Sequence, residues 1–263
     1  MDPANRTSGH GCEGAALALT GFVMLAAAGS PAVAGGCAFE AQGEGRVDKV
    51  IDATSFRLSD GREVRLAGIE PAMSDRASAL AKIVAGRDVS LRGEDDAPDR
   101  YGRQSAFVFL DGSETLVQDR LLAQGDALVA ATVTDKDCAS TLMAAEAGAR
   151  KAKQGIWADP LAIKNAESPG DILTGIGRFT VVEGKVLSVR QAGATTYLNF
   201  GRNWTQDFAV TISRRMLGAF ETAGITLKSL ENRRIRVRGF VEAHGGPRIE
   251  ASQVGQIELV GGN

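Results

Sequence analysis

The stretch Val50–Glu70 constrains the fold more than any other part of this chain. Polar and apolar residues alternate over Ser55–Leu58 and again over Glu63–Ile69, as they do in strands that are buried on one face. Asp60-Gly61 lies between the two segments and is a typical tight-turn signal, since glycine adopts a positive φ without steric cost. The stretch therefore predicts a β-hairpin.

An oppositely charged pair follows at the end of this hairpin. Arg65 lies on the second strand between apolar neighbours, and Glu70 follows five residues later, directly before Pro71. A cation and an anion are thus predicted to lie together where the strand ends, which is typical of a functional site. Alternatively, Arg65 is an ordinary solvent-facing residue that pairs with Glu63 or Glu70.

The hairpin resembles the staphylococcal-nuclease-like (thermonuclease) family. Two further motifs carry the resemblance, namely Asp99-Arg100-Tyr101-Gly102-Arg103 before a predicted strand and Gly155-Ile156-Trp157 after a predicted helix. The resemblance covers roughly residues 45–157. It implies a mainly β fold with helices (α+β), built as an OB-type five-stranded barrel with three helices.

The local patterns along this region agree with that fold. Besides the hairpin, strands are predicted at Gly45–Ile51, Asp88–Leu91 and Ser105–Leu110. Helices are predicted after the N-cap Ser74, from about Glu114 to Ala123, and over Ser140–Gln154.

The resemblance also implies a site. Active members hold a calcium ion on carboxylates, use a glutamate as general base and stabilise the transition state with two arginines. Arg65 and Arg103 match these arginines, and a guanidinium is suited to phosphate because it donates to two oxygens at once. Glu70 and Asp52 match two of the calcium-binding carboxylates, so Arg65, Arg103 and Glu70 are the expected catalytic residues.

Three positions depart from the family pattern. Thr54 stands where the second aspartate of the Asp-Gly-Asp motif is expected, which removes a formal charge from the metal site. Met73 stands where the general base is expected, and a thioether cannot accept the proton. Glu70 is one methylene longer than the family aspartate. Unless Asp75 substitutes as the base, the sequence predicts a phosphate pocket with weakened or lost turnover.

Two residues of the second motif have open interpretations. Arg103 is either a phosphate ligand or a turn cation that neutralises Asp95, Asp96 and Asp99. Tyr101 either stacks on a nucleic-acid base or caps the barrel.

The N-terminus has the layout of a secretory signal peptide. Arg6 precedes an apolar run from Ala15 to Ala28, and Ala32-Val33-Ala34 is a typical cleavage site. Residues 1–34 are therefore predicted to be removed on export to the periplasm or the extracellular space, with no stable membrane span afterwards. The alternative is an uncleaved membrane anchor.

Cysteine usage follows from this prediction. Cys12 would leave with the signal, so that Cys37 and Cys138 remain as an even pair in an oxidising compartment. A disulfide between them is expected, although two unrelated buried thiols are the alternative.

A second domain is predicted after a linker. Residues 35–158 form the thermonuclease-like domain, and residues 159–176, rich in Pro and Gly, form the linker. Residues 177–263 contain alternating segments, of which Arg234–Phe240 is the clearest, and predict a second small OB-like β-barrel of five strands. Residues 177–260 carry 12 Lys and Arg against 7 Asp and Glu, whereas residues 38–158 carry 16 against 20.

The second domain is also a candidate binder of polyanions. Arg234, Arg236 and Arg238 share one strand face by their spacing and are predicted to contact nucleic acid. Tyr197, Phe200 and Trp204 are aromatics that can stack on bases. The alternative is a solvated strand face with the aromatics in the core.

Three classes of function remain open at this point. The first is a secreted calcium-dependent phosphodiesterase that acts on DNA or RNA. The second is a weakened relative that binds nucleic acid or another polyanion without a cofactor, which we favour. The third is an envelope scaffold that makes protein contacts. His10 and His244 are the two histidines, and neither lies in a pattern that predicts a catalytic triad or a zinc site.

Overall fold

The computed structural model describes residues 36–72, 77–94 and 97–261. The described residues belong to one compact unit. The predicted signal peptide and the positions of Ser74, Met73 and Asp75 lie outside the described residues. Among the described helices, none has the length and apolar character needed to cross a lipid bilayer.

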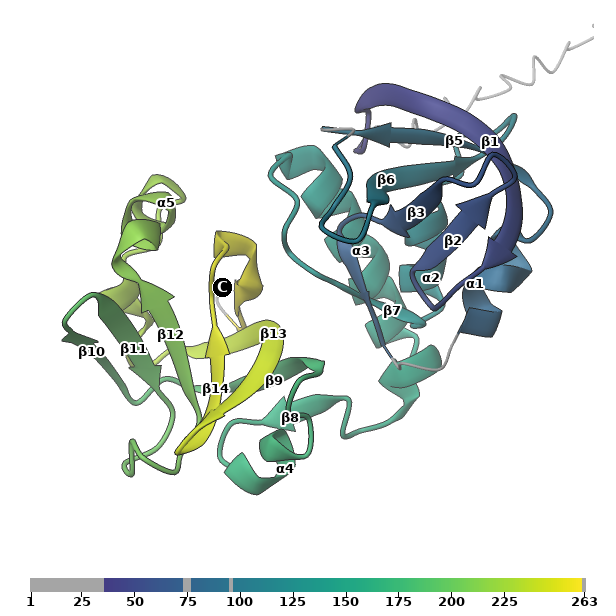
Figure 1. Ribbon diagram of the computed structural model, residues 1–263. Helices are drawn as coiled ribbons and strands as arrows, with labels where there is room; N and C mark the ends of the chain where they lie inside the picture. The colour runs from purple at the N-terminus through teal and green to yellow at the C-terminus, as the bar shows by residue number, and fades with distance from the viewer. Residues whose placement is uncertain (1–35, 73–76, 95–96, 262–263) are drawn as a thin grey trace, which may run out of the picture. The chain divides into compact units, whose positions relative to one another are not determined.

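A closed barrel of five strands forms the first half of the described chain, drawn in purple to teal in Figure 1. Its strands are β1 (Glu40–Val50), β2 (Ser55–Leu58), β3 (Glu63–Leu66), β5 (Asp88–Gly93) and β6 (Arg103–Leu110), in the spatial order β1-β2-β3-β6-β5. The β2–β3 hairpin is antiparallel, whereas β3 and β6 run parallel. This architecture confirms the predicted OB-type barrel.

Three α-helices accompany this barrel, as predicted. They are α1 (Ala77–Val84), α2 (Val117–Ala123) and α3 (Lys136–Lys151). The start of α3 precedes the predicted Ser140, because the carboxylate of Asp135 caps the helix by accepting a hydrogen bond from the N–H of Cys138. β4 (Ile69–Pro71) pairs with β7 (Ala127–Val129), and the short 3₁₀ turn η1 (Gly155–Ala158) buries Trp157.

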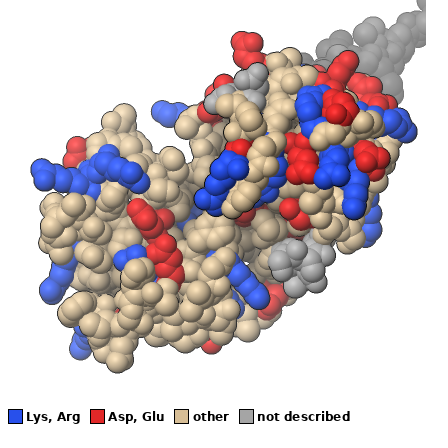
Figure 2. Space-filling view, viewed as in Figure 1, with Lys and Arg blue, Asp and Glu red and all other residues tan. Residues whose placement is uncertain are grey.

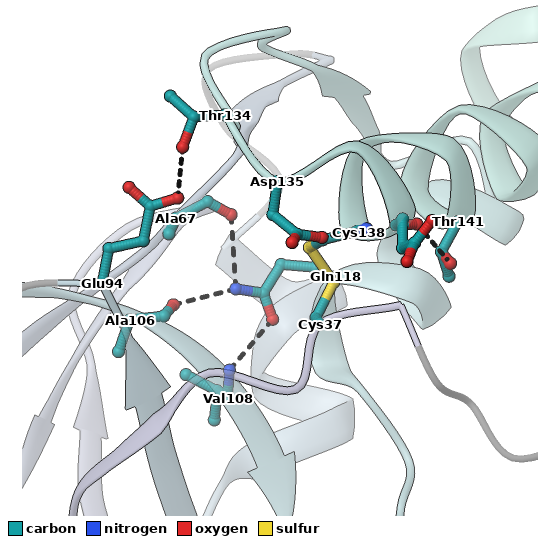
Figure 3. Close-up of a disulfide and its surroundings, with 11 residues drawn as sticks. Cys37, Ala67, Glu94, Ala106, Val108, Gln118, Thr134, Asp135, Cys138 and Thr141 are labelled. Carbon is teal, nitrogen blue, oxygen red and sulfur yellow. Dashed lines mark hydrogen bonds between the residues drawn. A yellow bond between two sulfur atoms is a disulfide. The ribbon is translucent and has the colours of Figure 1, made fainter.

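The predicted disulfide between Cys37 and Cys138 is confirmed (Figure 3). It links the segment before β1 to the first turn of α3, across 101 residues of sequence. Gln118 lies in the same region and is fully buried, and its side-chain amide is fully engaged. Its Nε2 donates to the carbonyls of Ala67 and Ala106, while its Oε1 accepts from the N–H of Val108.

The second half of the chain, green to yellow in Figure 1, repeats the same strand order. Its strands are β9 (Phe179–Lys185), β10 (Ser188–Ala192), β11 (Thr195–Asn199), β12 (Ala209–Ser213), β13 (Arg234–His244) and β14 (Gly246–Glu250), ordered β10-β11-β12-β14-β13-β9. β12 and β14 run parallel, like β3 and β6. The two barrels thus share one topology without an evident sequence repeat.

The second sheet contains eight strands where five were predicted, and the break at residues 186 and 187 accounts for one of the additional strands. β9 leads into β10 across these two residues. Val186 donates its N–H to the carbonyl of Arg233 on one side, and Leu187 donates to Asn199 on the other. β9 and β10 are therefore two parts of one bent segment. Its second part pairs with β11 and its first part pairs with β13, so that the segment joins the two ends of the strand order, as in an OB-type barrel.

Further elements extend this second sheet. β8 (Ile163–Asn165) pairs in parallel with β9, and β15 (Ile257–Leu259) pairs with β13. The remaining helical pieces are α4 (Pro169–Leu173), η2 (Arg214–Met216), α5 (Leu217–Thr222), η3 (Leu227–Leu230) and η4 (Val254–Gln256). Residues 159–176, predicted as a linker from their Pro and Gly content, thus include a strand of the second sheet, and Ile172 is fully buried. The domain boundaries stay a prediction.

Candidate functional site

Two arginines project from the same face of the first barrel. Arg65 on β3 lies opposite Ser105 on β6, and Arg103 lies opposite Glu63. Residues two apart on a strand share a face, so Arg65 and Arg103 are diagonal neighbours across the parallel pair. Val64 and Leu66, which flank Arg65, are buried in the barrel core. The alternation predicted for Glu63–Ile69 therefore places Arg65 outside that core, and Arg103 joins it because β6 begins at Arg103 and not at the predicted Ser105.

Glu70 lies against the first of these arginines. Nη2 of Arg65 donates to Oε1 of Glu70 at 2.8 Å. The Glu70 side chain is only 15% exposed, and this burial raises the pKa of Glu70 although the neighbouring Arg65 and Arg103 act to lower it. Asp52 adds a smaller upward contribution to the same pKa. The four groups therefore interact electrostatically in one region.

Arg103 is held by Asp99 within its own turn. Its Nε and Nη2 both donate to Oδ2 of Asp99, at 2.9 and 2.7 Å. Oδ1 of Asp99 accepts the N–H groups of Tyr101 and Arg103. These bonds, first of all the one from the Arg103 side chain, lower the pKa of Asp99 to about 2. Arg103 thus pairs with Asp99, while Asp95 and Asp96 lie outside the described residues.

Tyr101 extends into solvent beside these charges. Its side chain is 64% exposed, so it is not buried in the barrel. Its ring centroid lies 4.8 Å from the guanidinium of Arg100 and 5.0 Å from that of Arg103. The exposed ring therefore lies within cation–π distance of two guanidiniums next to the candidate site.

The side chain of Asp52 is bonded within its own turn. Oδ1 of Asp52 accepts from the N–H of Thr54 at 2.8 Å and from its hydroxyl at 3.2 Å. Thr54 is buried, and its hydroxyl serves this local turn. No group of three or more His, Cys, Asp or Glu is placed to hold a metal ion within residues 36–72, 77–94 and 97–261. Asp52 and Glu70 alone supply fewer anionic oxygens than a calcium site requires.

Positive and negative side chains are interleaved over the first barrel in the view of Figure 2. At the candidate site itself, Arg65 and Arg103 face the carboxylates of Glu70, Asp99 and Asp52. An incoming phosphate therefore competes with these carboxylates for the guanidiniums.

The arginine row of the second barrel is already occupied by carboxylates. Arg234 and Arg236 both donate to Glu183, and Arg236 also donates to Glu258. Arg238 is 1% exposed and donates twice to Glu146, at 2.9 and 3.0 Å. The face predicted to track a phosphate backbone is thus an ion-pair network. The sequence spacing alone did not reveal the partners, because they come from β9, β15 and α3.

The predicted aromatics of the second barrel separate into two groups. Phe200 is buried in the core, where its ring lies 5.0 Å from that of Phe208. Tyr197 is partly exposed, and Trp204 is 77% exposed.

The closed barrel and its strand order define the first half of the described chain as an OB-type domain. Residues 66–159 match the family model of staphylococcal nuclease homologues, and this part of the chain is a staphylococcal-nuclease-like domain. The matched region contains Glu70 and Arg103 but begins directly after Arg65. No curated protein matches the chain.

Proposed function

We propose that this chain is an exported thermonuclease-family protein whose first barrel binds nucleic-acid phosphates and has weak or no hydrolytic activity. The observation that carries the proposal is the grouping of Arg65 and Arg103 with Glu70, beside a turn in which Thr54 stands in place of a carboxylate.

Phosphate binding is supported by the donors of Arg65. Among the described residues, Arg65 donates a hydrogen bond only through Nη2, to Glu70, and its side chain is 31% exposed. A guanidinium in this state can turn a second edge toward two phosphate oxygens. Because the neighbouring carboxylates balance the arginines, binding should be weak and sensitive to salt.

Weak turnover is supported by two replaced residues, the expected general base and one expected calcium-binding carboxylate. A general base contributes about 10² to 10⁴ in rate, and the position expected for it is Met73. A calcium ion would polarise the phosphate and activate water, and Asp52 and Glu70 are the residues that would contact it. Thr54 brings a neutral hydroxyl that is bonded to Asp52 instead of a third carboxylate.

Export is supported by two features. The N-terminal sequence has the layout of a signal peptide, and Cys37 forms a disulfide with Cys138. Disulfides persist in oxidising compartments such as the periplasm and the extracellular space.

An active calcium-dependent phosphodiesterase is the second candidate, favoured by the grouping of Arg65, Arg103 and Glu70. Hydrolysis of labelled DNA and RNA by the purified mature chain, with calcium or with a chelator, separates the two candidates. We expect little calcium-dependent cleavage, together with salt-sensitive binding that Arg65→Ala weakens. Arg46→Ala is the matched control, since Arg46 is an exposed barrel arginine paired with Asp88. Robust calcium-dependent cleavage that Arg65→Ala abolishes would establish the second candidate.

A further inference from the structure

The second barrel carries a groove of about 970 Å³. Its floor is the face of β10, β11 and β12 opposite to the face that buries Leu198 and Val210. Arg190 pairs across the strands with Tyr197 on this floor. Loop 201–207 and the turn 244–246 between β13 and β14 form the walls. The groove is therefore built entirely from the second barrel, away from the arginine row at Arg234–Arg238.

The walls of the groove are fixed by local bonds. Asp207 accepts the N–H of Asn203 at 2.7 Å, and the side-chain oxygen of Asn203 accepts the hydroxyl of Thr205. The turn packs directly on this loop, since a Cβ at Gly246 would lie 2.5 Å from the carbonyl oxygen of Asp207. Gly245 approaches Thr205 equally closely and has a φ of 79°. The glycines thus allow loop and turn to form one preorganised rim.

This rim presents an aromatic ring to solvent. Trp204 is 77% exposed, more than any other large apolar side chain in the described part of the chain. Tyr197 provides a second, partly exposed ring on the floor. Trp204 and Tyr197 therefore provide two aromatic rings in one groove, on which planar ligands can stack.

The groove is also cationic. Arg190 and Arg202 are exposed and form no ion pair with any described residue. Arg248 pairs with Glu242 at 2.8 Å and adds a third guanidinium to the lining. The lining includes one carboxylate, that of Asp207, which is engaged by Asn203. This charge pattern contrasts with Arg234–Arg238, where carboxylates occupy the guanidiniums.

We propose that this groove binds single-stranded nucleic acid. Bases would stack on Trp204 and Tyr197, while Arg190 and Arg202 contact the phosphates. Single strands fit better than a duplex because their bases have free faces. β11 and β12 are the second and third strands of the barrel, and that face and the loop between the last two strands form the usual ligand surface of OB folds. The choice of nucleic acid over an acidic polysaccharide rests on the proposed function of the first barrel.

Intrinsic fluorescence tests this site separately from the first barrel. The chain has two tryptophans, and Trp157 is buried, so exposed-tryptophan quenching reports on Trp204. The mature chain is titrated with a short oligothymidylate in the presence of a chelator, which suppresses any calcium-dependent cleavage. We expect saturable, salt-sensitive quenching that persists in the Arg65→Ala variant. No quenching, or quenching that Arg65→Ala abolishes, would overturn the proposal.

Variants then locate the binding surface. By anisotropy with a fluorescein-labelled oligothymidylate in the Arg65→Ala background, Trp204→Ala should weaken binding by about ten-fold or more. Arg190→Gln combined with Arg202→Gln should weaken binding and reduce its salt dependence. Phe240→Ala and Arg233→Gln are matched controls, because both residues are exposed and neither lines the groove.

Different results would overturn the assignment to the groove, the choice of nucleic acid and the proposed function of the first barrel. An equal loss of oligothymidylate affinity in the control variants, or no loss of affinity with Trp204→Ala, would overturn the assignment of binding to the groove. Tighter binding of a polyuronate than of oligothymidylate, with the same Trp204 quenching, would overturn the choice of nucleic acid. Loss of Arg65-dependent binding alone would remove the proposed function of the first barrel and leave this site intact.

Discussion

Nη2 of Arg65 lies 2.8 Å from Oε1 of Glu70, where the β2–β3 hairpin ends and β4 begins. The carboxylate is the more buried member of this pair, and its burial raises the pKa of Glu70 in spite of the arginine. Glu70 therefore competes with any phosphate for Arg65, and it does so less strongly as it becomes protonated.

This competition predicts a pH dependence. Since the pKa of Glu70 is raised above its ordinary 4.5, protonation starts at a higher pH than in an exposed carboxyl group. The Arg65-dependent part of oligonucleotide binding should strengthen as pH falls through that raised pKa, and Glu70→Gln should bind tightly across the whole range. Anisotropy from neutral to mildly acidic pH measures both, with the exposed Glu44→Gln as control. If the change in affinity with pH persists unchanged in Glu70→Gln, a group other than Glu70 causes it, and the prediction is wrong.

Arg103 predicts a pKa shift in the opposite direction, because it lowers the pKa of Asp99. Because Arg103 lowers the pKa of Asp99 to about 2, the stabilising contribution of Asp99 is present above the ordinary value of 3.8 and is lost as pH falls through about 2. Arg103→Gln should return the pKa of Asp99 toward 3.8. Carboxyl chemical shifts from an NMR titration report this directly, and Arg46→Gln, which alters an exposed pair with Asp88, should leave Asp99 unchanged.

The buried pair of Arg238 and Glu146 predicts a large effect on stability. Glu146 also accepts the N–H of Val129 at 2.7 Å, so Glu146→Leu removes the two carboxylate bonds of a buried guanidinium, which keeps its bond to the carbonyl of Val129, and leaves a backbone donor without its acceptor. The free energy of unfolding should fall by about 3 to 5 kcal/mol.

Two comparisons sharpen this stability test in urea unfolding. The double variant Glu146→Leu with Arg238→Met should recover most of the loss, since no buried charge remains. Asp88→Asn, which breaks the exposed pair with Arg46, should change the free energy by less than about 1 kcal/mol. Equal effects of Glu146→Leu and Asp88→Asn would contradict the account of the buried pair.

The disulfide predicts a sensitivity to reductant. Cys37 and Cys138 are separated by 101 residues, and closing a loop of that size stabilises the folded state by about 4 to 5 kcal/mol in the chain-entropy model. The melting temperature of the mature chain should fall on addition of dithiothreitol, and the Cys37→Ser, Cys138→Ser variant should already melt at the lower temperature. A melting temperature that does not respond to reductant would contradict this prediction, because it would show that the disulfide contributes little to the stability of the folded state.

Local patterns were sufficient to predict most of the first barrel. The alternation at Ser55–Leu58 and Glu63–Ile69 fixed the hairpin, and its register placed Arg65 on the outer face. The even pair of cysteines predicted the disulfide before any distance was known. These features depend on neighbours in sequence or on residue counts, which the chain displays directly.

Contacts between distant segments were not predictable in the same way. Arg238 and Glu146 are 92 residues apart, so the strand pattern at Arg234–Phe240 suggested a free basic face. The segment at 159–176 was read as a linker because Pro and Gly outweigh its few apolar residues, yet Ile172 is buried. The groove needs loop 201–207 beside the turn 244–246, and only the folded barrel brings them together.

The most direct measurement compares calcium-dependent hydrolysis of DNA by the mature chain and by a variant in which the family carboxylates are restored. The variant combines Thr54→Asp, Glu70→Asp and Met73→Glu, and Arg65→Ala in that background is its control. We expect a rate near background for the natural sequence and a gain of about 10² or more in the restored variant, which Arg65→Ala removes. Rapid calcium-dependent cleavage by the natural sequence itself would contradict this expectation.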